Sequence, residues 1–289
     1  MANIENIKIL RERTGAGMMD CKHALDATDN NVDKACDWLR EKGIAKVAKK
    51  SDRIAAEGLT FIKVCDKCGK AIITELNCET DFVAKSDPFK KLCEDVTTEV
   101  LHNGYTDVKE IQDKTATLFT DATVKLGEKL TFRRFETITK TPEQCFGTYL
   151  HMGGKIGVIV LLSKDDSELA KGIAMSIAAN NPKYCKESDI PASDIEKETV
   201  IQTEVCKNDE KLKNKPEAAL QNIVKGKVHK VLSESVLEDQ YFVLEPEKSV
   251  GQVLKEKGNS IIKFVRYQVG EGLEKRVDNF AEEVAEQAK

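Results

Sequence analysis

The sequence is poor in aromatic residues and has no long apolar run. Only 6% of its 289 residues are aromatic, and no stretch of about 18 or more apolar residues occurs. A membrane-spanning helix is therefore excluded. The amino terminus also lacks the basic, apolar and small-residue sections of a secretory signal. We expect a cytoplasmic protein with no membrane partner.

Neither sign of charge is in large excess. The chain has 45 lysines and arginines against 49 aspartates and glutamates, a formal charge of -4. Proteins that bind phosphate backbones are strongly basic, so no direct nucleic-acid partner is expected. The basic run from Ile44 to Arg53 is interpreted as a solvated tether, with RNA binding as the alternative.

Motifs for common catalytic chemistry are missing. The sequence has no Gly-x-x-x-x-Gly-Lys-[Ser/Thr] phosphate loop, no Gly-x-Ser-x-Gly, no His-Glu-x-x-His and no Gly-x-Gly-x-x-Gly. Its histidines are far apart in sequence, which indicates no metal or nucleophile site: His23, His102, His151 and His229. The sequence thus predicts a protein that is not an enzyme, with no catalytic residue, no cofactor and no metal.

Cysteines are frequent, but they do not form a disulfide pattern. An odd number scattered along a long chain indicates reduced thiols in a cytosol: Cys21, Cys36, Cys65, Cys68, Cys78, Cys93, Cys145, Cys185 and Cys206. Cys65 and Cys68 could bind zinc together with Cys78 or Cys93. A closed zinc site needs four ligands, however, and there is no second Cys-x-x-Cys. We interpret the pair as incidental thiols, with a redox or zinc protein as the alternative.

The spacing of apolar residues predicts an α+β protein. Residues 1–54 are expected to form three helices and the basic tether, with Trp38 in the core and Gly43 just after the third helix. A strand-strand-helix pattern then occurs twice, which predicts a two-lobed core with antiparallel sheets. The expected segments are 55–140 for the first lobe, 141–190 and 237–270 for the second, 191–236 for an inserted helical hairpin, and 271–289 for a C-terminal helix.

Element boundaries follow from the same patterns. Strands are expected at 58–64, 70–76, 129–135, 147–151, 155–162 and 261–269, and helices at 88–101, 107–126, 168–179 and from about Asp278. The insertion has a narrow apolar seam, so it is expected to project as an antiparallel coiled-coil arm. Its seam residues are expected to be Ile195, Val200, Ile201 and Val205 on one helix and Leu220, Ile223, Val224, Val228 and Val231 on the other.

Phe82 follows a predicted strand and an acidic pair. It lies in Asn77-Cys78-Glu79-Thr80-Asp81-Phe82-Val83, just before a helix-start signal at Ser86-Asp87-Pro88, so the stretch is interpreted as a connection. Connections run over the surface and concentrate functional contacts. A single aromatic residue there can also fold back onto the core, and the local pattern leaves both possibilities open.

Two stretches resemble a known family. Leu10-Arg11-Glu12-Arg13-Thr14-Gly15-Ala16-Gly17-Met18-Met19-Asp20-Cys21-Lys22 and Asn77-Cys78-Glu79-Thr80-Asp81-Phe82-Val83-Ala84-Lys85 resemble the two signature stretches of the elongation factor Ts family. The order of the other segments agrees over essentially the whole chain. The resemblance implies a ubiquitin-associated-like (UBA-like) first domain and a guanine nucleotide exchange factor that releases GDP from elongation factor Tu. The partner would hold the nucleotide, which accounts for the missing phosphate loop.

The resemblance also implies roles for particular residues. The turn of Thr80, Asp81, Phe82 and Val83 would enter the GTPase near its bound Mg²⁺, with Leu126 and His151 in contact beside it. Arg11, Met18 and Met19 would grip a partner helix, although both methionines are also candidates for the core of the first domain. A C-terminal helix around Asp278 to Val284 would add a second grip.

Two further expectations concern partners. The resemblance makes the helical hairpin a candidate for pairing two copies of the chain, and its seam leaves the oligomeric state open. The alternative function is a UBA-type adaptor without exchange activity, which would explain the first three helices but not the stretch around Phe82.

Overall fold

The chain combines α-helices with antiparallel sheets, as the sequence predicts. The computed structural model describes residues 2–50, 52–209, 212 and 216–274, without the side chains of 44–49. The C-terminal helix expected from about Asp278 lies outside these residues. In the part of the chain that is described, none of the helices combines the length and the apolarity needed to cross a bilayer.

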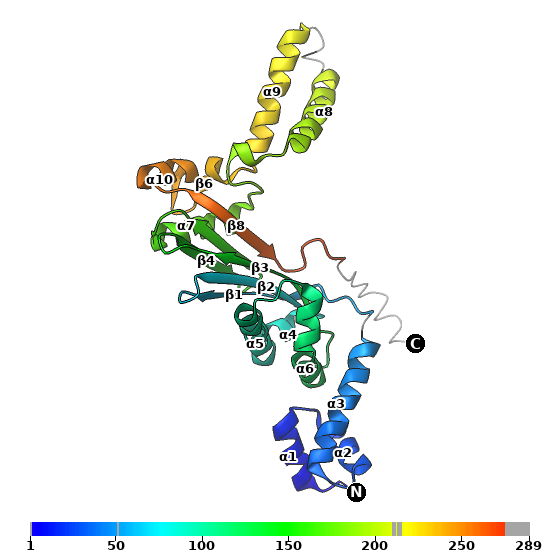
Figure 1. The fold of residues 1–289 in the computed structure, drawn as a ribbon. Helices are drawn as coiled ribbons and strands as arrows, with labels where there is room; N and C mark the ends of the chain where they lie inside the picture. Colours follow the sequence, from blue (N-terminus) through cyan, green and yellow to red (C-terminus); the bar gives the residue numbers. More distant parts are fainter. Residues whose placement is uncertain (1, 51, 210–211, 213–215, 275–289) are drawn as a thin grey trace.

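Three helices form one end of the molecule (Figure 1). Asn3 caps the first helix, which ends at Gly15 with a left-handed φ of 68° that favours glycine. The small core of this unit is aliphatic, and Trp38 is half-buried at its edge rather than central. The helices are α1 (Ile4–Thr14), α2 (Met18–Ala27) and α3 (Val32–Lys49).

The third helix is longer than expected from the sequence. Gly43 does not follow the helix but lies inside α3, which continues to Lys49. A Cβ atom at Gly43 would lie 2.6 Å from Val124 Cγ2 and 3.2 Å from Thr120 Cγ2, both on α6 (Val108–Leu126). The glycine therefore allows α3 and α6 to pack closely, and part of the expected tether is helix.

The first lobe is a three-stranded sheet with helices on one face. Its strands pair antiparallel in the order β1-β2-β3, and the central strand β2 is buried on both faces. The apolar stripe predicted for the helix after Ser86 is confirmed, because Phe89, Leu92, Cys93, Val96 and Val100 are all buried. The elements are β1 (Glu57–Cys65), β2 (Lys70–Cys78), α4 (Asp81–Lys85), α5 (Asp87–Asn103), α6, and β3 (Thr131–Thr139) instead of the predicted 129–135.

The second lobe has the same strand order. Its sheet pairs antiparallel as β4-β5-β8, with α7 and α10 against the apolar core. A Cβ atom at Gly147 would lie 2.2 Å from the carbonyl oxygen of Ala170, so this glycine permits close packing of α7. The elements are β4 (Cys145–His151), β5 (Ile156–Leu162), α7 (Ser167–Asn180), the 3-10 turns η1 (Glu187–Asp189) and η2 (Leu237–Asp239), β6 (Tyr241–Phe242), β7 (Glu245–Ser249), α10 (Val250–Lys257) and β8 (Ile261–Gln268).

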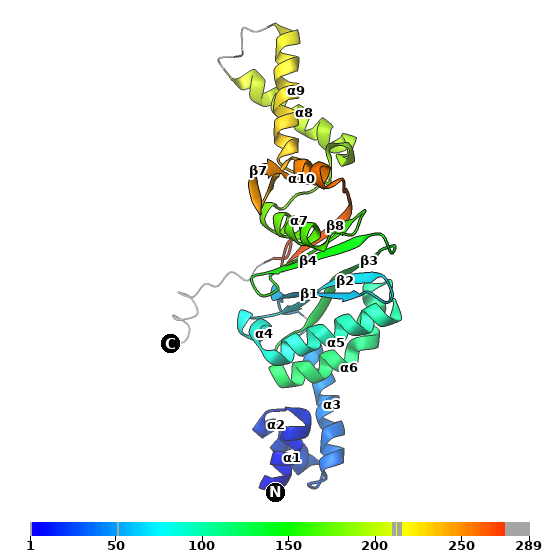
Figure 2. The ribbon, with the colours of Figure 1, turned by 90° about the vertical axis from the view of Figure 1, so that its left-hand side faces the viewer.

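The two sheets pack face to face, with helices on their outer sides (Figure 2). Ala71 and Ile73 of β2 meet Ile159 and Leu161 of β5 in the core between the sheets. These residues alternate with those that face the helices, as the two-residue period of a strand requires. The predicted two-sheet core therefore consists of four layers, with apolar packing between each adjacent pair.

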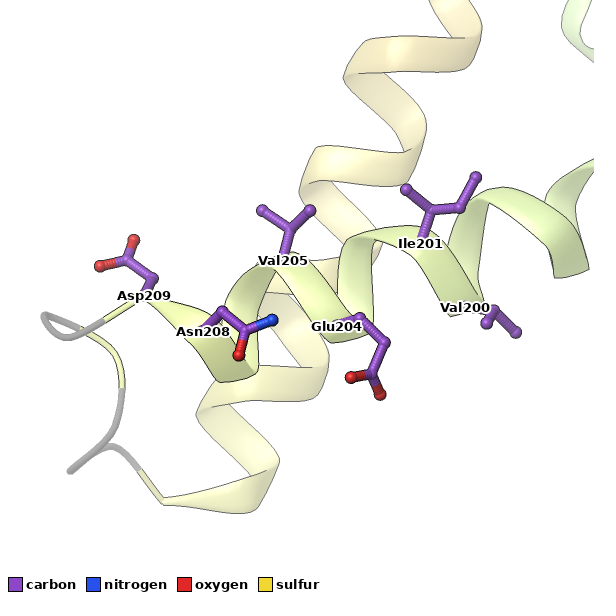
Figure 3. A pocket seen from close by; sticks show the side chains of 6 residues that line it. All are labelled: Val200, Ile201, Glu204, Val205, Asn208 and Asp209. Carbon is purple, nitrogen blue, oxygen red and sulfur yellow. The ribbon is translucent and has the colours of Figure 1, made fainter.

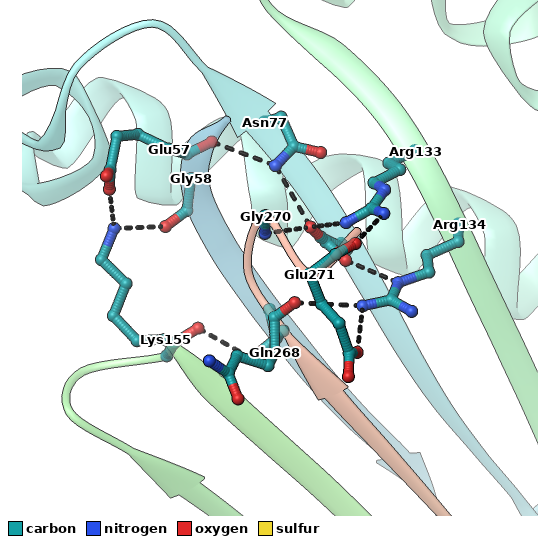
Figure 4. Close-up of polar contacts among 12 residues, drawn as sticks. Glu57, Gly58, Asn77, Arg133, Arg134, Lys155, Gln268, Gly270 and Glu271 are labelled. Carbon is teal, nitrogen blue, oxygen red and sulfur yellow. Dashed lines mark hydrogen bonds and ion pairs between the residues drawn. The ribbon is translucent and has the colours of Figure 1, made fainter. Parts of the chain in front are cut away.

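A buried carboxylate also connects the lobes. Glu75 on β2 is fully buried, and its oxygens lie 2.8 Å from Arg133 Nη1 and 2.6 Å from Arg134 Nε. The backbone N–H of Gly270, just after β8, donates to Glu75 at 2.9 Å (Figure 4). Burial alone would raise the pKa of Glu75, but the Gly270 N–H and the two guanidinium groups hold it below its ordinary value.

The inserted segment projects from the second lobe as an antiparallel helical hairpin, at the opposite end from α1 (Figure 1). It consists of α8 (Ala192–Asn208) and α9 (Glu217–Ser233). The seam expected for α8 is wrong, because Val200, Ile201 and Val205 are 65%, 54% and 47% exposed. Cys206 of α8 and Val224 of α9 are buried in the seam instead. Ile201 and Val205 are four residues apart and lie on one face of α8, whereas Val200 lies about 100° around the helix from Ile201.

Candidate partner-binding site

Phe82 lies on a short helix and points into solvent. The stretch interpreted as a connection contains the first turn of α4, and Thr80 Oγ1 caps it by accepting the N–H of Val83 at 3.3 Å. Ala84 is buried and Val83 is half-buried against the first-lobe core, whereas Phe82 is 82% exposed. The alternative in which Phe82 folds onto the core is therefore wrong.

The carboxylate of Glu128 holds the base of α4. Its Oε2 accepts the backbone N–H groups of Glu79 and Thr80, each at 3.0 Å. Its Oε1 accepts the hydroxyl of Thr80 at 2.6 Å. Three hydrogen bonds to one carboxylate fix the orientation of the residue that caps α4, and hydrogen bonds to an ionised acceptor are the stronger kind. Phe82 is consequently presented from a supported backbone.

A second carboxylate, that of Glu79, binds the backbone of the segment after α6 in return. Glu79 Oε1 accepts the backbone N–H of Lys129 at 2.6 Å, and Arg53 Nη1 lies 3.1 Å from Glu79 Oε2. The end of β2 and the segment after α6 therefore hold each other through two side chains. Because the N–H of Lys129 is used in this contact, β3 begins at Thr131 and not at the predicted position 129.

Asp81 in the first turn of α4 is paired within the helix. Its Oδ2 lies 2.6 Å from Nζ of Lys85, one helical turn later. The hydrogen bond from Lys85 lowers the pKa of Asp81, and the positive charge of Lys155 lowers it further. A carboxylate at a helix N-terminus is also favoured by the helix dipole. Asp81 thus presents a negative charge beside Phe82.

A turn of the second lobe lies against the first lobe near α4. The carbonyl oxygen of Gly154 accepts both the N–H and the hydroxyl of Thr60 on β1, at 2.7 and 2.8 Å. Lys155 forms an ion pair with Glu57 at the start of β1 (Figure 4). This turn therefore packs on β1, the strand that α4 also contacts.

His151 ends β4 at the beginning of that turn. Its side chain is exposed, and its Nδ1 lies 3.3 Å from the hydroxyl of Tyr149. The following Met152 is 72% exposed and has a left-handed φ of 50°. His151 therefore lies exposed at the start of the turn that packs on β1.

The predicted residues of the N-terminal helices are exposed. Arg11 is in the last turn of α1, and Met18 and Met19 begin α2, each of them 59% exposed. The interpretation of either methionine as a core residue is therefore wrong. A Cβ atom at Gly15, in the turn between α1 and α2, would lie 3.0 Å from Cδ of Lys125. This turn thus meets the end of α6.

Leu126 ends α6 and is only partly available to a partner. Its side chain is half-buried and packs against the first-lobe core. It lies two residues before Glu128 in the chain, and therefore close to the base of α4. In Figure 2, α4 is at the edge of the first lobe, on the side above α1 and α2. The end of α6 connects these two parts.

Sequence reasoning missed the residues that support Phe82. Glu79, Glu128 and Lys155 belong to segments far apart in the chain, and only folding brings their side chains to α4. The glycine at 127 marks the end of α6, where its φ is a left-handed 75°. It does not indicate which element Glu128 reaches.

The described part of this surface holds no metal-binding cluster. In the described ranges, no three side chains of histidine, cysteine, aspartate or glutamate are arranged to hold a metal ion. A pocket elsewhere, on the outer face of α8, is lined by Val200, Ile201, Glu204, Val205, Asn208 and Asp209 (Figure 3). Its apolar lining and its position on the projecting hairpin are typical of a protein contact rather than of a reaction site.

A comparison with known protein families agrees with this geometry. The family model described as Elongation factor TS matches residues 79–271, which is more than half of the chain. The chain belongs to the elongation factor Ts family. The match begins just before α4 and contains the end of α6 and the turn after β4, whereas the N-terminal helices precede it. As a member of the elongation factor Ts family, the chain is a translation elongation factor, and its family partner is elongation factor Tu.

Proposed function

We propose that this chain is the guanine nucleotide exchange factor of elongation factor Tu. It binds the GDP-bound GTPase in the cytoplasm, displaces Mg²⁺ and promotes GDP release so that GTP can bind again. No covalent step is involved. The observation that carries the proposal is the 82% exposure of Phe82 on a helix whose base is fixed by Glu128.

The exposure of Phe82 costs free energy in the isolated chain. Burying an apolar side chain of this size is worth roughly 1.5–3 kcal/mol, and this protein leaves that gain unused. Aromatic residues that enter a partner's pocket commonly carry much of the binding energy of an interface. A rigidly presented Phe82, flanked by the cap Thr80, by Asp81 and by Val83, is therefore suited to insertion into the GTPase beside its metal ion.

The exchange mechanism is a linkage between two ligands of the GTPase. A protein that binds the nucleotide-free GTPase more tightly than the GDP-bound form must weaken GDP binding by the same factor. Mg²⁺ is often the largest local charge in a phosphate site, so its displacement removes a major attraction for the β-phosphate. In this proposal Phe82 makes the insertion, and Asp81 engages the mobile elements of the partner that hold Mg²⁺.

The other predicted residues extend the contact. Leu126 and His151 would touch the GTPase beside Phe82; in support, Glu128, two residues after Leu126, holds the base of α4, and the turn after β4 packs on the neighbouring strand β1. Arg11, Met18 and Met19 would anchor a partner helix. The flexible thioether of methionine adapts well to a helix groove.

We also propose the domain assignment on which this picture rests. Residues 1–54 are a UBA-like domain, 55–140 and 141–190 with 237–270 are the two lobes, and 191–236 is a hairpin through which two copies pair. The exposed Val200, Ile201 and Val205 supply an apolar surface for such pairing. We assign 271–289 to a C-terminal module that adds a second grip on the GTPase.

The test is the release of a fluorescent GDP analogue from purified elongation factor Tu, at fixed Mg²⁺ and with excess unlabelled GDP. We expect acceleration at amounts of this chain well below those of the GTPase, because an exchange factor turns over. A UBA-type adaptor without exchange activity would bind through its first three helices and leave the release rate unchanged. That result would contradict the proposal.

A further inference from the structure

Two thiols at the turn between β1 and β2 have no part in the proposed function. Cys65 ends β1, and Cys68 is in the turn that leads into β2. The backbone N–H of Cys68 donates to Cys65 Sγ at 3.4 Å, and Cys68 Sγ donates to the carbonyl oxygen of Cys65 at 3.5 Å. Gly69 follows with a left-handed φ of 62°. These contacts place both sulfur atoms over one turn.

The other cysteines are poor candidates for thiol chemistry. Burial raises the pKa of the Cys78 thiol to about 12 and that of Cys185 to about 11. Burial also raises the pKa values of Cys21, Cys93 and Cys145. A thiol with a raised pKa has little thiolate, and only the thiolate attacks a disulfide. Most of the cysteines in the chain are therefore protected.

Cys65 and Cys68 differ from this group because they support each other at the surface. The neighbouring Cys68 side chain and the Cys68 N–H lower the pKa of the Cys65 thiol. The closeness of Cys65 raises the pKa of Cys68. Cys68 is exposed and Cys65 is half-buried. The pair thus has one sulfur disposed to be a thiolate and a second, in the same turn, that is disposed to retain its proton.

We propose that Cys65 and Cys68 form a dithiol site that reacts with low-molecular-weight disulfides. The Cys65 thiolate attacks one sulfur of the disulfide, forms a mixed disulfide and releases one thiolate. Cys68 then loses its proton, attacks Cys65 Sγ and releases the second thiolate. The protein loses two protons and two electrons, which together are two hydrogen atoms, and the small disulfide is reduced to two thiols. The turn already brings the two residues together, because the Cys68 N–H contacts Cys65 Sγ and Cys68 Sγ contacts the Cys65 carbonyl oxygen.

The site is remote from the proposed exchange surface. Cys65 pairs with Lys70 at the first residue of β2, and Phe82 follows its last residue, Cys78. At about 3.3 Å per residue, the nine-residue strand β2 separates the two by roughly 25 Å. Oxidation of the pair is therefore expected to leave nucleotide exchange intact, and the two proposals can fail separately.

The test is incubation of the full, reduced chain with glutathione disulfide, followed by alkylation, intact mass measurement and peptide mapping. In the wild-type chain we expect a loss of two hydrogen atoms, located in the peptide with Cys65 and Cys68. Cys68→Ser is expected to accumulate one glutathione on Cys65. Cys65→Ser is expected to react at Cys68 severalfold more slowly than Cys68→Ser reacts at Cys65, because the backbone N–H of residue 68 still stabilises the Cys65 thiolate.

Matched controls make the result decisive. Cys36→Ser removes a half-buried thiol on α3 and is expected to lose two hydrogen atoms at Cys65 and Cys68 as the wild type does. Circular dichroism establishes that each variant is folded. If glutathione disulfide modifies other cysteines first and leaves both Cys65 and Cys68 free to be alkylated, the proposal is overturned. So would equal rates for the two single variants, or a stoichiometric bound metal ion that keeps the pair reduced.

Discussion

The carboxylate of Glu128 accepts both the backbone N–H and the side-chain hydroxyl of Thr80, at 3.0 and 2.6 Å. Thr80 in turn caps α4 through Val83. The residue that starts the helix of Phe82 is therefore fixed by a side chain from the segment after α6, so the account predicts that Glu128 affects exchange through α4.

Glu128→Gln should lower exchange by loosening α4. A neutral amide is a weaker acceptor than a carboxylate, and we expect a loss of about 1–2 kcal/mol in the free energy of unfolding. GDP release at saturating concentration should slow severalfold. Glu247→Gln, at an exposed position of β7, is the matched control and should behave like the wild type. The double variant Phe82→Ala/Glu128→Gln should release GDP no more slowly than Phe82→Ala alone, and additive losses would show that Glu128 acts by another route.

Arg11→Ala should weaken formation of the complex. Arg11 is exposed at the end of α1, near Met18 and Met19, so its removal should not affect folding. We expect about a tenfold loss of affinity for nucleotide-free elongation factor Tu, which is about 1.4 kcal/mol. Titration calorimetry measures it, with Arg40→Ala on α3 as the control for charge. Equal affinities for the two variants would mean that the anchor lies elsewhere.

Gly43→Ala should destabilise the protein although alanine favours helices. The new Cβ would lie 2.6 Å from Val124 Cγ2, which forces α3 away from α6. Overpacking of this kind typically costs about 1–3 kcal/mol. Gly226→Ala on α9 is the matched control, because nothing lies within 4 Å of its new Cβ. It should stabilise its helix by up to about 1 kcal/mol. Urea denaturation would distinguish the two, and equal stabilisation by both would contradict the close contact.

Glu75 should make the free energy of unfolding depend on pH in the acidic range. Its pKa is lowered in the folded chain, so the unfolded chain takes up the proton first as the pH falls. The contribution of Glu75 to the free energy of unfolding is complete above the unfolded pKa, about 4.3, and is lost as the pH falls through the lower folded value. Below about pH 4.3, the urea midpoint of the wild type should therefore fall more steeply than that of Glu75→Gln.

The same variant tests the cluster at neutral pH. Glu75→Gln leaves Arg133 and Arg134 without their buried anion, and we expect a loss of about 3 kcal/mol or more. Parallel pH profiles for the two chains, or an unchanged stability at neutral pH, would show that the cluster does not connect the lobes as described.

Most of the architecture could be predicted from the sequence because local patterns encode it. The stripe from Phe89 to Val100 and the alternating strands of both lobes follow from period alone. Gly43 shows where this reasoning fails. A glycine after a helical stripe usually ends the helix, but here it is kept inside α3 by the approach of α6, which no local pattern records.

The site could be predicted only in part for the same reason. Exposure of Phe82, Met18 and Met19 depends on tertiary packing, and their local sequence was equally compatible with a core. The seam predicted for α8 was wrong because a helix with apolar residues on two faces does not indicate which face its partner covers. Glu128 reaches Thr80 across 48 residues of chain, a relationship visible only in the folded structure.

The most direct measurement is the maximal rate of GDP release from elongation factor Tu with saturating wild-type chain and with Phe82→Ala. Phe82 is largely exposed, so its replacement should change stability by no more than about 0.5 kcal/mol. Leu244→Ala, at another exposed apolar residue, controls for surface hydrophobicity. We predict that Phe82→Ala slows maximal release at least about tenfold, or about 1.4 kcal/mol, while the complex still forms. An unchanged maximal rate would contradict the insertion of Phe82.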